Sequence, residues 1–402
     1  MWESLQSSLF RYYLNYKYRA KRIKKYVNED KVFIDSNSVI IKSFLENKKN
    51  SNKVIRAAAV QMEMKIYENP YDFANKMEEF VFFAKKNGAD LLVFPEENLL
   101  QLIGLLPDLA ELSNNNRSRS TKKDLKKEKN YENKSIVEKE NNKVKKENIT
   151  KEITIEKILA DLGMDISIID ILAFIGPTIK NISLAIFSAL AQKYGLFIMT
   201  GSGFLPDSLK EKQNIYNIAY LFGANGEFIG EQKKCHLLPM ETQWGISRGD
   251  SINIYNTDIG KLSFPICMDA SYFESFKIAS MKGAQIIMIP IANPDPDYNY
   301  WTALRGIWGR VQESNVYGIK SAMIGDFFGF HLSGQAGIYA PLPLSRNLDG
   351  IIAESRTYNQ EEIVIADLDL DLLEDYKKGI IEEDNRVFID RYFPTVYQKD
   401  LE

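Results

Sequence analysis

A cysteine at the end of a β-prone run has the clearest capacity for covalent chemistry in this chain. Cys267 follows residues 263–266, and the residues after it can turn into a helix. Backbone N–H groups of such a turn point towards the sulfur and can favour the thiolate, which is the nucleophilic form of cysteine. A lone intracellular cysteine is more often a small buried hydrophobe, so a catalytic interpretation of Cys267 requires partner residues.

Two other short stretches place charged residues next to apolar runs. Residues 91–95 read as a strand that stops at proline, and Glu96 and Glu97 follow it directly. Residues 230–241 carry Lys234 in the string Lys-Cys-His-Leu and end at a further glutamate. A thiol, a carboxylate and an ammonium group are what cleavage of an amide or nitrile needs: a nucleophile, a proton carrier and a group that stabilises developing charge.

The three stretches in this order resemble the nitrilase, or carbon–nitrogen hydrolase, superfamily. That family reads strand-Pro-Glu, then Lys-x-His-Leu, then Ile-Cys-x-Asp-x-x-aromatic-x-Glu, and the patterns are met here at residues 95–96, 234–237 and 266–274. The resemblance covers roughly residues 54–371, apart from a long insertion. It implies an α/β fold with a four-layer α-β-β-α sandwich, which strand and helix periodicity alone does not distinguish from a doubly wound single sheet.

The resemblance implies a role for each motif residue. Cys267 is expected to be the nucleophile, and Glu96 the general base that takes the thiol proton, gives it to the leaving nitrogen and then activates water against the thioester. Lys234 and the backbone N–H of Met268 are expected to stabilise the oxyanion, and the charge of Lys234 is expected to favour ionisation of the thiol. Glu241 is implied as a second carboxylate that orients Lys234 and the substrate.

Several assignments compete with a neighbouring residue. Side chains alternate along a strand, so only one of Glu96 and Glu97 is expected to point inwards, and the Pro-Glu register favours Glu96. The Lys-x-His-Leu spacing selects Lys234 over Lys233. His236 is expected to be a hydrogen-bonded structural residue, because the mechanism has no step for it.

The expected substrate is a small non-peptide amide or nitrile, handled without a cofactor. Trp244, Asn293, Tyr298 and Trp301 are expected to line its pocket, and the aromatic, acidic loop that holds the last three suggests an amine-bearing or sugar-like molecule. A metal site is not expected, because the chain has two histidines and structural or catalytic zinc sites usually need more ligands of this kind.

A serine hydrolase is the main rival among enzymes. Residues 245–249 satisfy the string Gly-x-Ser-x-Gly around Ser247, and Asp297 and His331 follow in the order of an α/β-hydrolase triad. That motif requires an apolar strand before the serine and a helix after it, whereas polar residues flank Ser247 on both sides. The context therefore disfavours the serine mechanism.

Two other functions remain open at the level of sequence. The fold can serve as a catalytically silent binding or regulatory module, although the full set of expected polar residues argues against this. The thioester can also pass its acyl group to an acceptor other than water. Amide hydrolysis is preferred to nitrile hydrolysis on the breadth of the family alone.

Bulk composition limits the partners and the compartment. The chain has 402 residues, 45% hydrophobic and 26% charged, with a net charge of -3, so no general attraction to nucleic acid is expected. It has two cysteines and no recognisable signal peptide, which makes a reducing cytoplasm the expected location. The resemblance further implies a homodimer.

The chain divides into a catalytic domain with additions on each side. Residues 1–52 form a basic, aromatic helical extension, a composition compatible with a membrane surface or an acidic partner; residues 53–375 form the hydrolase domain; and residues 376–402 form a tail. An insertion is expected at about residues 107–180. Its charged, low-complexity part at 113–152 is expected to be disordered, because it cannot bury enough apolar surface to order itself.

The elements that position the motif residues begin with a βαβ unit. Residues 54–62 read as a strand, 72–87 as a helix and 89–94 as the next strand. Residues 153–190 are apolar but are interrupted by charged residues and by Pro177, so no membrane span is expected and a separate core helix is expected over 182–194.

Overall fold

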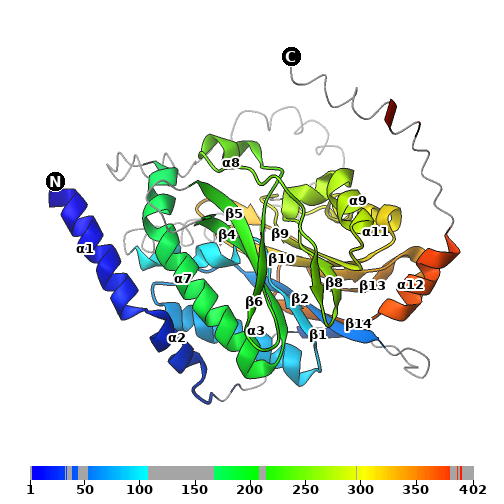
Figure 1. Cartoon of the computed structure of the whole chain (residues 1–402), viewed down its shortest axis with the longest axis horizontal. Coiled ribbons are helices and arrows are strands. Elements are labelled where there is room, and N and C mark those ends of the chain that lie inside the picture. The colour runs from blue at the N-terminus through cyan, green and yellow to red at the C-terminus, as the bar shows by residue number, and fades with distance from the viewer. Residues whose placement is uncertain are drawn as a thin grey trace, which may run out of the picture.

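The strands of the core form one continuous hydrogen-bonded ladder that folds into two facing layers (Figure 1). The computed structural model describes residues 2–31, 33, 39–43, 53–106, 167–207, 214–295, 297–380, 387 and 390–391. The strands are β1 (Val39–Ser43), β2 (Val54–Glu63), β3 (Leu91–Val93), β4 (Phe197–Pro206), β5 (Ile215–Phe222), β6 (Phe228–Lys233), β7 (Tyr255–Thr257), β8 (Gly260–Ser263), β9 (Ile286–Ala292), β10 (Tyr317–Phe327), β11 (Phe330–Leu332), β12 (Gly337–Tyr339), β13 (Ile351–Glu354) and β14 (Glu362–Asp369). Along the main path their order is β6-β5-β4-β3-β2-β10-β9-β8-β7, and β14 also pairs with β2.

Side-chain alternation shows how this ladder forms two layers. In β2, the odd-numbered residues 55–59 pack in a central apolar cluster, whereas the even-numbered residues 58–62 pack in a second cluster with helices. In β9, residues 286 and 288 join the central cluster, and residues 287 and 289 face a third cluster. Because successive side chains of a strand point to opposite faces, the central cluster lies between the two layers. The layers join where residues 61–63 of β2 pair with residues 322–324 of β10.

Helices cover both outer faces of this pair of sheets. The described α-helices are α1 (Trp2–Lys17), α2 (Ala20–Val27), α3 (Pro70–Lys86), α7 (Ile168–Tyr194), α8 (Pro239–Gln243), α9 (Phe273–Met281), α10 (Tyr300–Arg305), α11 (Trp308–Ser314) and α12 (Leu370–Gly379). Helices α3 and α7 lie on one side of the strands, and α9 and α11 lie on the other (Figure 1). The predicted four-layer α-β-β-α sandwich is therefore confirmed, and the predicted βαβ unit appears as β2, α3 and β3.

Helix α7 corrects the prediction of a break near Pro177. The helix runs without interruption through Pro177, from an N-cap at Ser167 to a left-handed C-cap at Gly195. Proline removes one backbone hydrogen bond, but packing of the apolar face on β4 offsets this loss, and Gly176 sits directly against Pro206. By length and composition α7 is the one described helix that could cross a membrane, yet 61% of its most apolar window is buried inside the protein, as in a core helix.

The N-terminal extension contributes a strand as well as the expected helices. Helix α2 packs on α7 through buried Ile23 and Val27, and β1 pairs in parallel with β14. Helix α1 leaves Tyr12, Tyr13 and Tyr16 more than half exposed. The predicted low-complexity segment at 113–152 and most of the predicted tail lie outside the described residues.

Candidate active site

The first carboxylate of the site is held by a turn that follows β3. The strand ends at Val93, and Phe94, Pro95 and Glu96 follow it, beside β4. Gly201 makes the close approach of β4 feasible, because its φ is +72° and an added Cβ would lie 2.0 Å from the carbonyl oxygen of Pro95. The turn therefore fixes Glu96 at the carboxyl end of the strand, where its side chain is 2% exposed.

The lysine and the second carboxylate come from the segment between β6 and α8. Lys234 follows β6 directly and is 1% exposed. Glu241 lies in the first turn of α8, where its Oε2 accepts a hydrogen bond at 2.7 Å from the backbone N–H of Leu238. This contact fixes the carboxylate at the helix N-terminus, where the positive end of the helix is favourable for an anion. Lys233, the competitor of Lys234, instead faces outwards towards Asp207.

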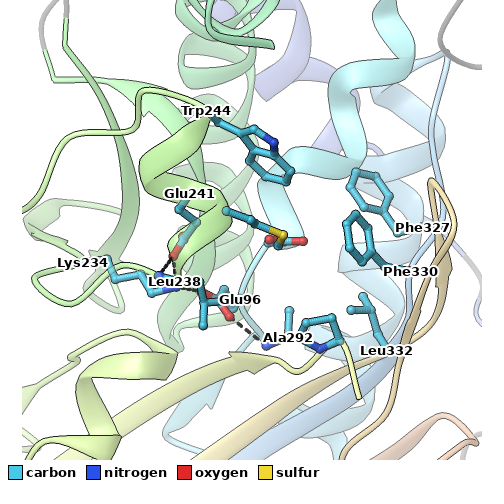
Figure 2. Close-up of a pocket in the computed structure, with 12 residues that line it drawn as sticks. Glu96, Lys234, Leu238, Glu241, Trp244, Ala292, Phe327, Phe330 and Leu332 are labelled. Atoms are coloured by element: carbon cyan, nitrogen blue, oxygen red, sulfur yellow. Dashed lines mark hydrogen bonds and ion pairs between the residues drawn. The ribbon is translucent and has the colours of Figure 1, made fainter. Parts of the chain in front are cut away.

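The buried charges contact one another directly. Lys234 Nζ donates to Glu96 Oε1 at 2.9 Å and to Glu241 Oε2 at 2.8 Å, so one ammonium bridges two carboxylates (Figure 2). Asn217 of β5 donates to both carboxylates, at 3.0 Å to Glu96 and 3.1 Å to Glu241. The backbone N–H of Ala292 donates to Glu96 Oε2 at 2.9 Å. Each of these carboxylates is thus held by several donors.

Cys267 lies at the start of the 3₁₀ helix η3 (Cys267–Ser271), in strained backbone geometry. Its φ is +42°, a left-handed conformation that costs on the order of 1–3 kcal/mol for a residue with a side chain. The strain is held by Asp269, whose carboxylate accepts from the N–H groups of Ile266, Cys235 and His236 at 2.8 to 3.1 Å. The same carboxylate therefore ties the turn at Cys267 to the loop that carries the lysine.

His236 is hydrogen-bonded, as the sequence analysis predicted for a structural residue. Its Nδ1 lies 2.8 Å from Asp269 Oδ1, and its ring stacks on Tyr272 with centroids 3.9 Å apart. Neither contact involves Glu96 or Lys234. Both Cys235 and Cys267 are free thiols.

The ionisation of Cys267 depends on opposing effects of burial and nearby charge. Burial and the adjacent charge and hydrogen bond of Glu96 raise the pKa of the Cys267 thiol well above its ordinary value, and Lys234 opposes this only in part. The expected effect of Lys234 is present, because its charge lowers the pKa of the Cys267 thiol, but burial and Glu96 outweigh it. The thiol keeps its proton until a base takes it.

Burial and neighbouring charges set the pKa of the expected base and of the lysine. Burial, opposed by Lys234, raises the pKa of Glu96. Burial alone would lower the pKa of Lys234, but the charges of Glu96, Cys267 and Glu241 outweigh it and raise the pKa. The lysine therefore remains a fixed positive charge, while Glu96 is able to hold and release a proton.

Glu97 occupies a place that strand alternation did not predict. It lines the same small cavity as Glu96, and burial together with the charge of Glu96 raises its pKa to about 8. The alternation argument was wrong because β3 ends at Val93 and Glu97 adopts a left-handed φ of +61° outside any strand. Even so, Glu96 and not Glu97 is the carboxylate that pairs with Lys234.

Two cavities meet at this site. The smaller, of about 20 Å³, is lined by Glu96, Lys234 and Glu241, with Trp244 and Phe330 across from them (Figure 2). The larger, of about 230 Å³, is lined by Cys267 and by residues of β9, α10 and β10, among others. The two cavities share three wall residues, which are Leu238, Ala292 and Pro294. The thiol and the charged group thus open onto adjacent spaces.

The predicted substrate-binding residues divide into two groups. Trp244 lines the smaller cavity, and Asn293 and the predicted oxyanion donor Met268 line the larger one. Tyr298 and Trp301 line neither: Tyr298 stacks on a neighbouring tyrosine, and Trp301 is 76% exposed. The expected aromatic wall is absent because Asn299 caps α10, with its side chain accepting from the N–H of Thr302, and the helix presents Trp301 to solvent.

The serine-hydrolase arrangement is not formed. Ser247 follows α8, and residues 248–254 contain neither helix nor strand, so the required strand–turn–helix is missing. His331 instead pairs with Asp326, at 2.8 Å, on the hairpin between β10 and β11. In the described residues, no group of three or more histidine, cysteine or acidic side chains is arranged to hold a metal ion.

Two polar residues of the site were missed from the sequence. Asn217 lies within the apolar strand β5 (Ile215–Phe222), and Lys320 lies within the mostly buried strand β10. The available signal was the same for both: an amide or a charge inside a mostly apolar run is costly to bury unless it has a defined partner or ligand.

The chain is similar to known proteins in sequence and in fold. A family model described as "Carbon-nitrogen hydrolase" matches residues 171–378, just over half of the chain. The "Probable hydrolase YhcX" of Bacillus subtilis (strain 168) is 30% identical over 324 residues, covering 79% of this chain but 50% of that protein, so this chain spans about half of that relative's length. "Omega-amidase NIT2" of Danio rerio is 26% identical over 208 residues, covering 49% of this chain and 70% of that protein.

A solved structure shows the same fold at low sequence identity. The carbon-nitrogen hydrolase from Helicobacter pylori G27 superposes with a TM-score of 0.56 and 18% identity, covering 85% of this chain and 98% of that one. The family predicted from three short motifs is therefore confirmed by a family model, by relatives in sequence and by the fold. This chain belongs to the carbon-nitrogen hydrolase family.

Proposed function

We propose that this protein hydrolyses the carbon–nitrogen bond of a small non-peptide amide through a thioester on Cys267. The observation that carries the proposal is the single ammonium of Lys234 bridging Glu96 and Glu241 beside a half-buried thiol that keeps its proton. This arrangement supplies a nucleophile, a proton carrier and a fixed positive charge at one place.

Formation of the thioester requires Glu96 to act first as a base. Its carboxylate takes the proton of the Cys267 thiol, and the sulfur attacks the amide carbon. Charge develops on the carbonyl oxygen, where Lys234 and the backbone N–H of Met268 stabilise it. Glu96 then gives its proton to the leaving nitrogen, the carbon–nitrogen bond breaks, and ammonia or an amine departs. The raised pKa of Glu96, caused by burial, suits a group that must both accept and donate this proton.

Breakdown of the thioester uses the same groups a second time. Glu96 removes a proton from a water molecule, and the resulting hydroxide adds to the thioester carbon. Lys234 again stabilises the oxyanion, and the carbon–sulfur bond then breaks with return of the proton to the thiolate. The products are a carboxylic acid and the free thiol, so the cycle is closed without a cofactor. Glu241 and Asn217 act as positioning residues, because they hold Lys234 and Glu96 in place.

An ammonia-release screen across small amides and nitriles tests this function. The wild-type protein is expected to release ammonia from at least one amide, and Cys267→Ala is expected to release none. Added hydroxylamine is expected to divert the thioester to a hydroxamate, which is measured by its ferric colour. A matched Cys235→Ala variant is expected to keep the activity. The Cys235 thiol donates a hydrogen bond to the backbone carbonyl oxygen of Ser251, and Cys235 lies outside both cavities.

Each other outcome removes a defined part of the proposal. Activity that survives Cys267→Ala would exclude the thioester mechanism. Release from nitriles alone would replace the amide by a nitrile, and product formed only with an amine acceptor would make the protein an acyl transferase. Binding of amides without turnover under all these conditions would identify a silent binding module.

Location, assembly and surface contacts complete the proposal. A catalytic thiol is best preserved in a reducing cytoplasm, and the expected homodimer is tested by light scattering coupled to gel filtration. The exposed tyrosines of α1 lie among cations such as Lys17 and Arg22, a composition suited to peripheral contact with an anionic membrane. Co-sedimentation with anionic and neutral vesicles tests this contact; equal binding to both would exclude it.

A further inference from the structure

Glu97 is a third acid of the active site, and no step of the proposed mechanism uses it. It lines the smaller cavity together with Glu96, Lys234 and Glu241. The other two carboxylates bond to the ammonium of Lys234. The carboxyl of Glu97, by contrast, forms no hydrogen bond or ion pair with any described residue. A polar group in a cavity without a protein partner leaves its hydrogen bonds to water or to a ligand.

The backbone at Glu97 holds this side chain at the cavity. Its φ is +61°, a left-handed conformation that is unfavourable for a residue with a side chain. Its carbonyl oxygen accepts from the N–H of Leu100 at 3.0 Å, at the start of the 3₁₀ helix η1 (Asn98–Leu105). Unfavourable backbone conformations of this kind occur preferentially at functional sites. The conformation of Glu97 therefore points to a task in the site.

The two cavities differ in what they hold. The smaller has a volume of about 20 Å³ and the larger of about 230 Å³. On this scale about 10–15 Å³ is enough for one water molecule, so the smaller cavity holds one water and little else. The larger cavity holds a molecule of several heavy atoms.

The lining residues place the thiol and the base on different sides. Cys267 lines the larger cavity and not the smaller, whereas Glu96 and Lys234 line the smaller and not the larger. An acyl group on the sulfur of Cys267 therefore extends into the larger cavity. The smaller cavity, which shares the walls Leu238 and Ala292 with the larger, then adjoins the thioester on the side of the base.

We infer that the smaller cavity holds the water molecule that hydrolyses the thioester, and that Glu97 positions this water for Glu96. The inference rests on the proposed function and specifies its second half. Glu96 takes one proton of the water, the oxygen adds to the thioester carbon, the carbon–sulfur bond breaks, and that proton passes to the sulfur of Cys267. The second proton of the water stays in the acid product. During the attack its O–H group donates a hydrogen bond to Glu97.

The protonation of Glu97 suits this positioning task. Burial and the charge of Glu96 raise the pKa of Glu97 to about 8, so at neutral pH the side chain is mainly an uncharged acid. Its carbonyl oxygen accepts a hydrogen bond from the water, and the group does not compete with Glu96 for the proton. Glutamine offers the same carbonyl oxygen, whereas methionine has a similar length and no oxygen.

Aromatic walls limit the size of the group that attacks the thioester from this side. Trp244, Phe327 and Phe330 line the smaller cavity around the charged groups (Figure 2). With room for one water, the cavity disfavours any larger acceptor. The same cavity thus favours hydrolysis over transfer of the acyl group to another molecule.

Partition of the thioester between water and hydroxylamine tests the role of Glu97. p-Nitrophenyl butyrate acylates Cys267 with release of nitrophenol, and mass spectrometry measures butyric acid and butyrohydroxamate, with Cys267→Ala as the blank. The ratio of hydroxamate to acid is independent of how fast the thioester forms, so damage to acylation does not change it. We expect this ratio to rise about two- to tenfold in Glu97→Met, the loss caused by one hydrogen bond, and to stay close to the wild-type value in Glu97→Gln.

Acceptors of graded size test the limit set by the cavity. Hydroxylamine, O-methylhydroxylamine and O-benzylhydroxylamine compete for the same butyryl-enzyme. The wild-type preference for the smallest over the largest is expected to exceed that of a butyryl thioester free in solution by about tenfold or more. Phe330→Ala is expected to reduce this preference. Phe328→Ala is the control, because Phe328 follows β10 in the same hairpin but does not line the smaller cavity.

The outcomes separate this water site from the proposed function. If amides are hydrolysed and Glu97→Met partitions like the wild type, the role of Glu97 is refuted and the hydrolase function stands. If Glu97→Gln is impaired as much as Glu97→Met, positioning by an uncharged acid is refuted. A wild-type size preference equal to that of the free thioester, or one that Phe328→Ala reduces as much as Phe330→Ala, would refute the size limit. If no amide is hydrolysed but loss of the butyryl group still depends on Glu97, the amidase function is refuted and the water site stands.

Discussion

The two cavities at Cys267 contrast in how they treat charge. In the smaller cavity one ammonium and two carboxylates compensate one another, and Asn217 and the N–H of Ala292 complete the arrangement. In the larger cavity the charged group is Lys320, which has a distant carbonyl oxygen and an aromatic ring. A preorganised set of paired charges is ready for chemistry, whereas an unpaired buried charge is ready for a ligand.

This contrast assigns different tasks to the two sides of the thiol. The compensated side has fixed dipoles that need not reorganise as charge develops in the reaction. The uncompensated side gains most from binding an ion, because the ammonium of Lys320 is already buried in the folded protein and no further charge of the protein has to be desolvated. Variants that remove charge on one side or the other therefore test the contrast, and their expected effects differ in kind and in size.

The largest expected effect is on catalysis in Glu96→Gln. The amide keeps the shape of the side chain but cannot transfer the proton, so kcat is expected to fall by about 10² to 10⁴. The same change removes a negative charge that raises the pKa of Cys267, so alkylation of the thiol by iodoacetamide should extend to lower pH. Steady-state kinetics and alkylation rates measure the two effects. A drop in kcat of less than tenfold would contradict the role of Glu96.

A large effect on stability is expected from Lys234→Met. The substitution leaves Glu96 and Glu241 buried together without their cation, which should lower the free energy of unfolding by about 3–5 kcal/mol near neutral pH. Lys320→Met is the matched control: it strands no paired carboxylate, so its free energy of unfolding should change by only about 1 kcal/mol, or increase. Urea denaturation of the two variants gives both values. Equal destabilisation would abolish the distinction between the two lysines.

The sequence was sufficient for residues whose roles are carried by local patterns. Pro95-Glu96, the Lys-x-His-Leu string and the run ending at Cys267 each mark the end of a strand, and strand ends meet in an α/β fold. The sequence was insufficient where three-dimensional surroundings decide the outcome. The direction of Glu97 depends on a left-handed turn, and the proton of Cys267 depends on burial. Helix α7 continues through Pro177 because tertiary packing outweighs the local preference.

Asn217→Leu is expected to have an intermediate effect. The substitution removes a donor to both carboxylates, and a hydrogen bond to a charged group contributes about 1.5–3 kcal/mol, so kcat should fall roughly 10- to 150-fold. KM should change less, since Asn217 lines neither cavity. Kinetics on the best amide measure both constants. A rise in KM with unchanged kcat would show that Asn217 serves binding and not the positioning of the two carboxylates.

The smallest expected effect is a change of slope with pH in Glu97→Gln. Burial raises the pKa of Glu97 from 4.5 to about 8, so between these values the folded protein holds a proton that the unfolded chain has lost. Stability therefore falls as pH rises through this window, by less than about 1.4 kcal/mol per pH unit, which is the limit for one proton. Glutamine does not titrate, and the variant should lose this contribution. Urea denaturation at pH 5 to 8 gives the slope of the free energy of unfolding against pH for the wild type and for the variant. Identical slopes would show that Glu97 is ionised throughout this range, so that the smaller cavity holds a third negative charge.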